Sequence, residues 1–197
     1  MIEFLIPIVS FAVAASVTPG PNTLMVTASG ANFGYSRTNP HMLGIAFGFP
    51  VMIIAVGLGL GRFFAAYPQA HEVLKWLGTA YLLFLAWKIA CAGRSKSGEQ
   101  TGRPFSFVQA ALFQWLNPKA WIVAVSSLTA FTTVGGNYVT ETAFIAALFA
   151  AISYPACAVW CLFGTAIGRY LRSDRALKVF NTSMAALVVA SIAMLYI

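Results

Sequence analysis

Nearly the whole chain lies in six apolar runs, and these runs limit what it can fold into. Of its 197 residues, 59% are hydrophobic and 9% are charged, with a mean hydropathy of +0.79. A water-soluble domain has about 25% charged residues, whereas about 20 apolar residues suffice for a helix to cross a bilayer. The sequence therefore predicts one domain over residues 1–197, an all-α integral membrane protein with six transmembrane helices. Their approximate ranges are 2–31, 41–64, 75–91, 105–131, 142–167 and 179–197.

The first and fourth runs are interrupted, at Thr18-Pro19-Gly20-Pro21-Asn22 and at Asn117-Pro118-Lys119. Proline has no N–H to donate and clashes with the preceding turn of a helix. In lipid the backbone must satisfy its own hydrogen bonds, so each interruption predicts a broken helix. About 12 residues of helix, or roughly 18 Å, precede the second break, which places it near the middle of a hydrocarbon core of about 30 Å. The first break lies at a similar depth if its run begins at the N-terminus.

Each break also has the pattern of a helix start. Asn117 is a good N-cap with Pro118 at the first helical position, Thr18 precedes Pro19 in the same way, and Asn22 could cap instead. A half-helix that starts in the membrane directs free N–H groups and a positive dipole end toward the interior. That arrangement suits an anionic group such as a carboxylate.

Lys119 follows the second break, where a cation is unfavourable for two reasons. It opposes the helix dipole, and a cation near the bilayer centre costs about 2.5–3.5 kcal/mol on insertion scales. We consider three roles: Lys119 holds a substrate carboxylate, it carries a coupling proton, or it is satisfied by carbonyls that the break in the fourth run leaves free. If the two breaks form one central site, Gly20 and Lys119 must lie close together.

The two breaks also mark an internal repeat. Pro19 and Pro118 are 99 residues apart, and the same shift maps the second run onto 140–163 and the third onto 174–190. Because three spans is an odd number, the halves 1–92 and 105–197 would cross the membrane in opposite directions, with 93–104 as linker. This predicts two inverted three-helix repeats, as in many secondary transporters. The alternative is that the six runs are evenly spaced by chance and that the chain has no internal repeat.

The basic residues predict the orientation. Nine of the twelve Lys and Arg lie in the first, third and fifth loops or beside them, and only Arg62 and Lys75 lie around the second and fourth. Positively charged loops stay in the cytoplasm, so both termini are predicted outside. The same placement explains the net charge of +7 without a nucleic-acid partner. Glu3 and the lack of a basic N-terminal region argue against a cleavable signal peptide.

The sequence predicts no catalytic residue, metal site or cofactor. Cys91, Cys157 and Cys161 lack metal-binding spacing with histidine, so we expect them to be packing residues. His41 and His71 would lie on opposite sides of the membrane, and no acidic cluster occurs. These features do not favour a membrane-embedded enzyme. Such an enzyme and a non-transporting assembly subunit are the two alternatives to a transporter.

The chain is similar to a known family in motifs that follow one another along its whole length. They are Thr18-Pro19-Gly20-Pro21-Asn22, Gly44-Ile45-Ala46-Phe47-Gly48, Lys75-Trp76-Leu77-Gly78-Thr79-Ala80-Tyr81-Leu82, Leu85-Ala86-Trp87-Lys88 and Asn117-Pro118-Lys119-Ala120. Together they resemble the LysE/RhtB family of amino-acid exporters. The resemblance implies a six-span exporter of the bacterial inner membrane, driven by protons and forming a homodimer.

The second run refines the resemblance. Its segment Gly48-Phe49-Pro50-Val51-Met52-Ile53 looks closest to the cysteine and O-acetylserine exporter branch. Family members often carry an aspartate in this span, and this chain has none there. The resemblance thus implies a neutral amino acid or derivative as substrate, and it leaves the proton carrier unassigned.

The predicted substrate site combines both breaks with polar or flexible positions nearby. Gly44 and Gly48 form a G-x-x-x-G pair that lets another backbone approach closely, and Tyr154 precedes Pro155, which frees a carbonyl. The predicted residues are Pro19, Gly20, Pro21, Asn22, Gly44, Gly48, Asn117, Pro118, Lys119 and Tyr154. Other hydroxyl and amide side chains within the runs, among them Thr23, Gln114 and Ser153, are expected to be packing contacts.

Overall fold

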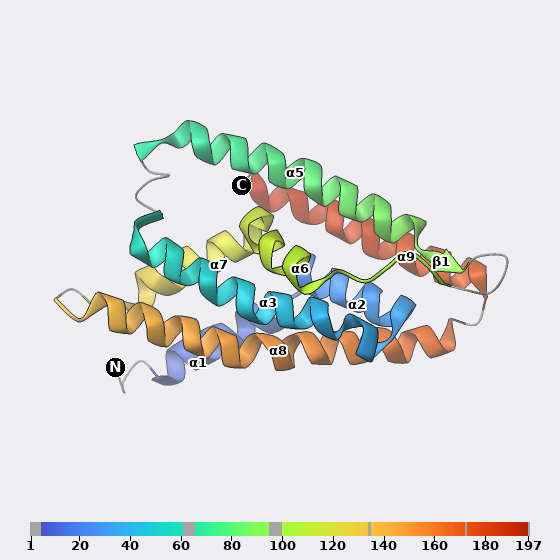
Figure 1. The fold of residues 1–197 in the computed structure, drawn as a ribbon, viewed down its shortest axis with the longest axis horizontal. Coiled ribbons are helices and arrows are strands. Elements are labelled where there is room, and N and C mark those ends of the chain that lie inside the picture. The colour runs from blue at the N-terminus through green and yellow to red at the C-terminus, as the bar shows by residue number, and fades with distance from the viewer. Residues whose placement is uncertain (1–4, 61–65, 95–99, 134, 172, 197) are drawn as a thin grey trace.

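The structure is a computed structural model, and it describes residues 5–60, 66–94, 100–133, 135–171 and 173–196. These residues form a helical protein, as predicted, and the one pair of short strands lies in the linker (Figure 1). The helices are α1 (Leu5–Val17), α2 (Pro21–Phe33), α3 (Tyr35–Ala55), α5 (Pro68–Cys91), α6 (Phe107–Phe113), α7 (Pro118–Phe131), α8 (Tyr138–Tyr170) and α9 (Asp174–Ala190). The shorter elements are the π-helix η2 (Val56–Leu60), the 3₁₀ helices η3 (Gln114–Leu116) and η4 (Ser191–Leu195), and the antiparallel strands β1 (Gly93–Arg94) and β2 (Gln100–Thr101).

Four of the described helical segments are long and apolar enough to cross a membrane. They are Tyr35–Leu60, Glu72–Cys91, Tyr138–Tyr170 and Asp174–Ala193. The pair α1 and α2, bent by 51° at the first break, makes a fifth if it counts as one span. The fourth apolar run forms two shorter segments, the apolar helix 107–116 and the 14-residue α7, on either side of Asn117. Both breaks therefore interrupt helices where the prolines predict them.

Several helices begin earlier than the apolar runs suggest. The predicted loop before residue 41 is mostly helical, because α3 starts at Tyr35 and the turn needs only Gly34, whose φ is 78°. Asn137 caps α8 by accepting from the N–H of Thr140 at 3.1 Å, and Ser173 caps α9 in the same way. Polar residues beside an apolar run thus serve as N-caps rather than as loop.

The unbroken helices pack in two pairs, with the broken helices between them. In Figure 1, α5 runs beside α9 along one side of the protein, and α8 runs beside α3 along the other. Helix α2 packs along α8 and also contacts α3 and α9, whereas α6 packs on α3 and α1 packs on α8. This arrangement buries Gly20 of the first break and Asn117 of the second, whereas Thr18 and Pro19 of the first break are exposed.

Glycines allow the broken helices to approach their neighbours closely. A Cβ atom added at Gly44 would lie 2.3 Å from the carbonyl oxygen of Phe107, and one at Gly48 would lie 2.5 Å from the Cα of Ala111. These distances are shorter than any real Cβ contact, so the backbones of α3 and α6 touch at the predicted G-x-x-x-G pair.

Helix α8 carries a second pair of this kind, which the sequence analysis does not single out. A Cβ atom at Gly164 would lie 2.1 Å from the carbonyl oxygen of Thr27, and one at Gly168 would lie 2.5 Å from that of Ala31. The hydroxyl of Thr165 donates to the carbonyl of Gly30 at 3.2 Å. Helices α2 and α8 are therefore held in backbone contact.

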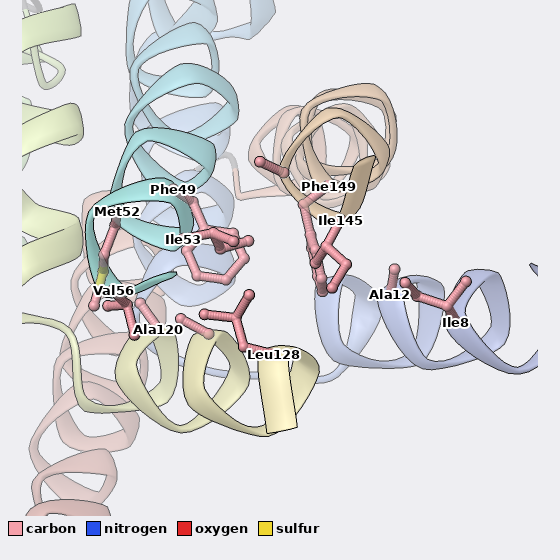
Figure 2. Close-up of a cluster of buried hydrophobic side chains, with 12 residues drawn as sticks. Ile8, Ala12, Phe49, Met52, Ile53, Val56, Ala120, Leu128, Ile145 and Phe149 are labelled. Atoms are coloured by element: carbon pink, nitrogen blue, oxygen red, sulfur yellow. The ribbon is translucent and has the colours of Figure 1, made fainter. Parts of the chain in front are cut away.

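An apolar cluster fills the protein between α1, α3, α7 and α8 (Figure 2). Phe49 and Phe149 meet edge to face in it, with ring centroids 5.1 Å apart and an interplanar angle of 88°. Ile8 and Ala12 of α1 and Ala120 and Leu128 of α7 belong to the same cluster (Figure 2). It joins α1, which precedes the first break, and α7, which follows the second, to α3 and α8.

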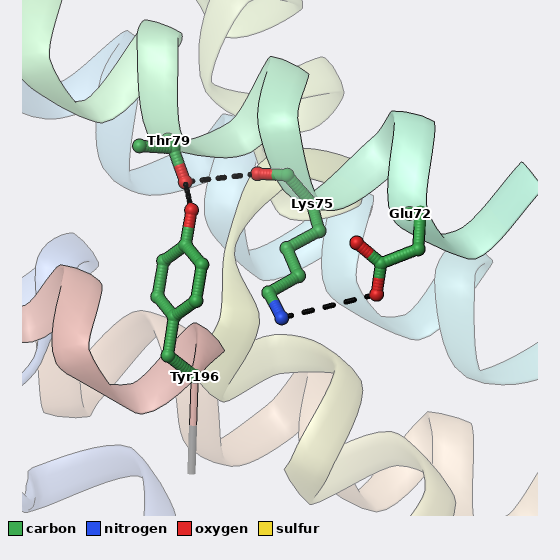
Figure 3. A network of polar contacts seen from close by, with 4 residues as sticks. All are labelled: Glu72, Lys75, Thr79 and Tyr196. Atoms are coloured by element: carbon green, nitrogen blue, oxygen red, sulfur yellow. Dashed lines mark hydrogen bonds and ion pairs between the residues drawn. The ribbon is translucent and has the colours of Figure 1, made fainter. Parts of the chain in front are cut away.

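The end of the chain is fixed to α5 by a polar network (Figure 3). The hydroxyl groups of Thr79 and Tyr196 lie 3.2 Å apart. The ammonium of Lys75 lies 4.2 Å from the ring centroid of Tyr196, and it forms an ion pair of 3.9 Å with Glu72. These contacts hold η4, the continuation of α9, against the beginning of α5.

Candidate functional site

The two breaks are in direct contact. The ammonium of Lys119, in the first turn of α7, donates to the carbonyl oxygen of Thr18 at 2.5 Å. The stem of the same side chain lies against Gly20, where an added Cβ would be 2.7 Å from Lys119 Cδ. The predicted proximity of Gly20 and Lys119 is thus present. The carbonyl that accepts from Lys119 belongs to the first break and not to the break in the fourth run.

A pair of amides links the same two regions. Asn22 Nδ2 donates to Gln114 Oε1 at 2.8 Å, and Gln114 Nε2 donates to Asn22 Oδ1 at 3.3 Å. Gln114 is fully buried in η3, and its Nε2 also donates to the carbonyl of Ala110 at 2.8 Å. The amide pair and Lys119 therefore tie the start of α2 to both sides of the second break.

Some backbone carbonyl and N–H groups at the first break have hydrogen-bond partners among the described residues, and others do not. The carbonyl of Val17 accepts from Trp160 Nε1 at 3.0 Å, and the N–H of Gly20 donates to Thr23 Oγ1 at 2.9 Å. Pro21, at the first position of α2, has no N–H. The backbone N–H groups of Asn22 and Thr23 have no hydrogen-bond partner among the described residues. The start of α2 consequently offers two donors to a bound anion.

The second break is capped more completely. Asn117 has an extended backbone, and its side-chain oxygen accepts from the N–H of Lys119 at 3.1 Å. The N–H groups of Ala120 and Trp121 donate to the carbonyl of Asn117. This cap fixes the direction in which α7 starts, and so it aims the Lys119 side chain at the first break.

A cavity of about 60 Å³ lies where the breaks meet. A buried water needs about 10–15 Å³ measured in the same way, so the cavity has room for a few waters. Its polar lining comes from Ser16, Gly20, Asn22, Thr23, Gln114, Asn117, Lys119 and Ser153, and its apolar lining from Ala15, Ile45, Phe49, Ala120, Val123, Phe149 and Cys157. The described residues of the lining include one cation and no carboxylate. The cavity can accept a small molecule that carries a carboxylate and an apolar or neutral remainder.

The predicted residues occupy three different places. Those that line the cavity are Gly20, Asn22, Asn117 and Lys119, whereas Pro19, Pro21 and Pro118 set the ends of the helices beside it. Gly44 and Gly48 contact α6 and are outside the lining.

Tyr154 lies outside the lining as well. Its hydroxyl donates to Asn39 Oδ1 at 2.8 Å and lies 3.0 Å from the hydroxyl of Tyr35. These contacts join α8 to the start of α3. The side chain next to it, Ser153, is the one that lines the cavity, because successive residues of a helix point about 100° apart.

Four lining residues, namely Thr23, Gln114, Ser153 and Cys157, were expected to be packing residues. Thr23 and Gln114 lie within one turn of a break, and that position is the signal that could have selected them. Ser153 and Cys157 are one turn apart on α8 and have no such signal, because they reach the cavity only through the packing of α8 on α2 and α3.

Curated relatives match most of the chain in sequence. A cysteine/O-acetylserine efflux protein of Escherichia coli O157:H7 is 28% identical over 164 residues, which cover 83% of this chain and 83% of the relative. The protein of the same name from Escherichia coli K12 is 27% identical over the same shares. No solved structure matches the chain. The family model described as LysE type translocator matches residues 13–197, and the chain therefore belongs to the LysE type translocator family.

Proposed function

We propose that this amino-acid exporter carries small neutral amino acids, with cysteine and O-acetylserine as the first candidates. Relatives at 27–28% identity are named for the efflux of these two compounds. The observation that supports the proposal is the small cavity, whose described lining residues include Lys119 as the one cation and no carboxylate. A basic substrate would leave its second positive charge buried without a partner, which is unfavourable.

The substrate carboxylate would lie between Lys119 and the start of α2. There it would accept from the Lys119 ammonium and from the free N–H groups of Asn22 and Thr23, which are charge-assisted hydrogen bonds. Lys119 would release the Thr18 carbonyl when the carboxylate arrives. The α-ammonium group would donate to neutral oxygens such as those of Asn117 and Ser153, which line the same cavity.

Two inverted repeats would provide alternating access to this site. In this proposal α6 and α7 form one broken span, so that the chain has six spans, with both termini outside. Three packing relations support the symmetry: α3 pairs with its counterpart α8, α5 pairs with its counterpart α9, and α1 packs on α8 as α6 packs on α3. Proton coupling through Lys119 and a homodimer belong to the same proposal.

The apolar cluster of Figure 2 would be the outer barrier. Phe49, Phe149 and Ala120 belong both to this cluster and to the cavity lining. Substrate could leave toward the end that holds the start of α1 and the end of α7 only if these side chains separate. Export would thus consist of opening this cluster while the opposite side of the cavity closes.

Counterflow in proteoliposomes tests the proposed function. Vesicles loaded with unlabelled O-acetylserine should accumulate labelled O-acetylserine or cysteine, and labelled lysine should not accumulate. A pH gradient should drive net transport of the same substrates. A protein that catalyses counterflow of no amino acid in the panel would contradict the proposal and would favour a non-transporting subunit.

Cys157 provides a direct test of the site. We expect a maleimide or methanethiosulfonate reagent to modify a variant that retains Cys157 alone, because this thiol lines the cavity. O-acetylserine, which has no thiol, should slow the modification by about 10-fold at ten times its dissociation constant. The rate is measured by quenching samples over time and counting the remaining thiol.

Cys91 serves as the matched control, because its side chain is exposed and lies outside the central cavity. A variant that retains Cys91 alone should react at the same rate with and without O-acetylserine. Equal protection of both thiols, or of neither, would place the substrate outside the cavity described above.

A further inference from the structure

A second and larger cavity lies between α2, α5 and the segment that leads into α6. Its volume is about 280 Å³, more than four times that of the central cavity. Met25, Phe33, Leu85, Ile89 and Phe105 give it apolar walls. The linker residues 102–104 border it together with Phe105, so it opens at the end of the molecule where β1 lies (Figure 1).

Two cations border this cavity, and no described carboxylate lies beside them in its lining. Lys88 and Arg103 belong to that lining, whose described residues include neither aspartate nor glutamate. The Lys88 ammonium lies 5.8 Å from the ring centroid of Phe105, another lining residue. Among the described residues the one ion pair is that of Lys75 with Glu72, so neither Lys88 nor Arg103 is neutralised there. The rim of the cavity therefore attracts an anion.

A buried histidine borders the same space. His41 is 1% exposed, and neither of its ring nitrogens has a hydrogen-bond partner among the described residues. Its ring packs 5.2 Å from that of Phe105, beside which Lys88 lies. A buried polar group without a partner is costly. A ligand oxygen, or a water that enters with the ligand, would supply the missing partner once the ring turns toward the cavity.

The combination of apolar walls and a cationic rim selects an amphiphile with an anionic head. A zwitterionic amino acid fits poorly, because no carboxylate among the described lining residues faces its ammonium group. Trp87, also in the lining, is 62% exposed, and tryptophan in a membrane protein favours the interface between lipid and water. Basic pockets between transmembrane helices on the cytoplasmic side bind the head groups of acidic lipids.

We propose that this cavity binds an acidic glycerophospholipid. Its phosphate would lie between Lys88 and Arg103, and an acyl chain would lie along Met25 and Leu85. The lipid would hold α5 and the linker against α2, the helix whose first turn forms part of the central site.

Native mass spectrometry with defined lipids tests this proposal. The purified protein should retain one phosphatidylglycerol more tightly than phosphatidylethanolamine, which has the same apolar part and no net charge. The double variant Lys88→Gln/Arg103→Gln should bind phosphatidylglycerol about 25-fold more weakly, since each basic residue near such a head group contributes a factor of about five. Both side chains are exposed at their polar ends, so the variant should fold normally.

Arg169→Gln/Lys178→Gln is the matched control. It removes two exposed cations of the same predicted side that do not line the cavity, and its affinity for phosphatidylglycerol should be that of the wild type. His41→Phe keeps a ring in place and should weaken the lipid about 5-fold through the loss of one hydrogen bond. The proposal would be overturned if both double variants lost the same affinity for phosphatidylglycerol, or if the wild type bound phosphatidylethanolamine as tightly. It would also be overturned if glycerol phosphate, at the same concentration as the lipid, displaced the lipid, because that would indicate a simple anion site.

Discussion

We expect Lys119→Met to lower amino-acid export by about 100-fold while the protein remains folded in the membrane. The ammonium is the one cation among the described residues that line the central cavity. Removing one partner of a buried, charged hydrogen bond costs about 2–5 kcal/mol, and 1.4 kcal/mol corresponds to a factor of ten. Methionine keeps an unbranched stem that can still pack against Gly20. The rate of labelled O-acetylserine transport in proteoliposomes measures the effect.

Two transport modes separate the roles of Lys119. If Lys119 holds the substrate carboxylate, the variant loses both counterflow and transport driven by a pH gradient. If it only carries the coupling proton, counterflow persists and the driven transport is lost. Lys178→Met removes an exposed cation from α9 and should leave both modes unchanged. Full export by Lys119→Met in both modes would reduce the residue to a structural link with the Thr18 carbonyl.

The breaks and their contact were predictable from the sequence because they rest on large local costs. A proline inside a membrane helix and a lysine at mid-membrane are both unfavourable, and each requires a specific compensation. One contact, from the Lys119 ammonium to the Thr18 carbonyl, serves both requirements. It pairs the half-buried cation, and it satisfies a carbonyl that the first break leaves without a helical partner.

Other parts of the site depend on how distant elements pack, and no local pattern predicts them. The amide pair of Asn22 and Gln114 requires that η3 lie beside the start of α2. Tyr154 was predicted to bind substrate because Pro155 follows it and frees a carbonyl. Its hydroxyl donates to Asn39 instead, because the rotation of α8 directs Ser153 toward the cavity. The early start of α3 at Tyr35 has a similar cause, since tertiary contacts extend a helix beyond the apolar run that signals it.

The largest expected effect on stability belongs to Gly164 of α8. We expect Gly164→Ala to destabilise the protein by about 3 kcal/mol, which lowers Tm by about 10 °C for a chain of this size. The new Cβ would lie 2.1 Å from the carbonyl oxygen of Thr27. That oxygen belongs to the backbone of α2, so no side-chain rotation relieves the clash and the two helices must separate. Thermal unfolding in detergent, followed by gel filtration, measures the change.

Gly93→Ala is the matched control, because a Cβ there meets no atom within 4 Å and its φ is not positive. Its Tm should equal that of the wild type.

Gly164→Ala should also affect transport, because both helices contribute side chains to the central cavity. Helix α2 presents Asn22 and Thr23 to the cavity and α8 presents Ser153 and Cys157, so spreading the helices widens the site. At a temperature where the variant is still folded, the affinity for O-acetylserine should therefore fall together with Tm. A variant with normal stability would show that the two helices can separate at no cost, and that their close contact does not set the width of the site.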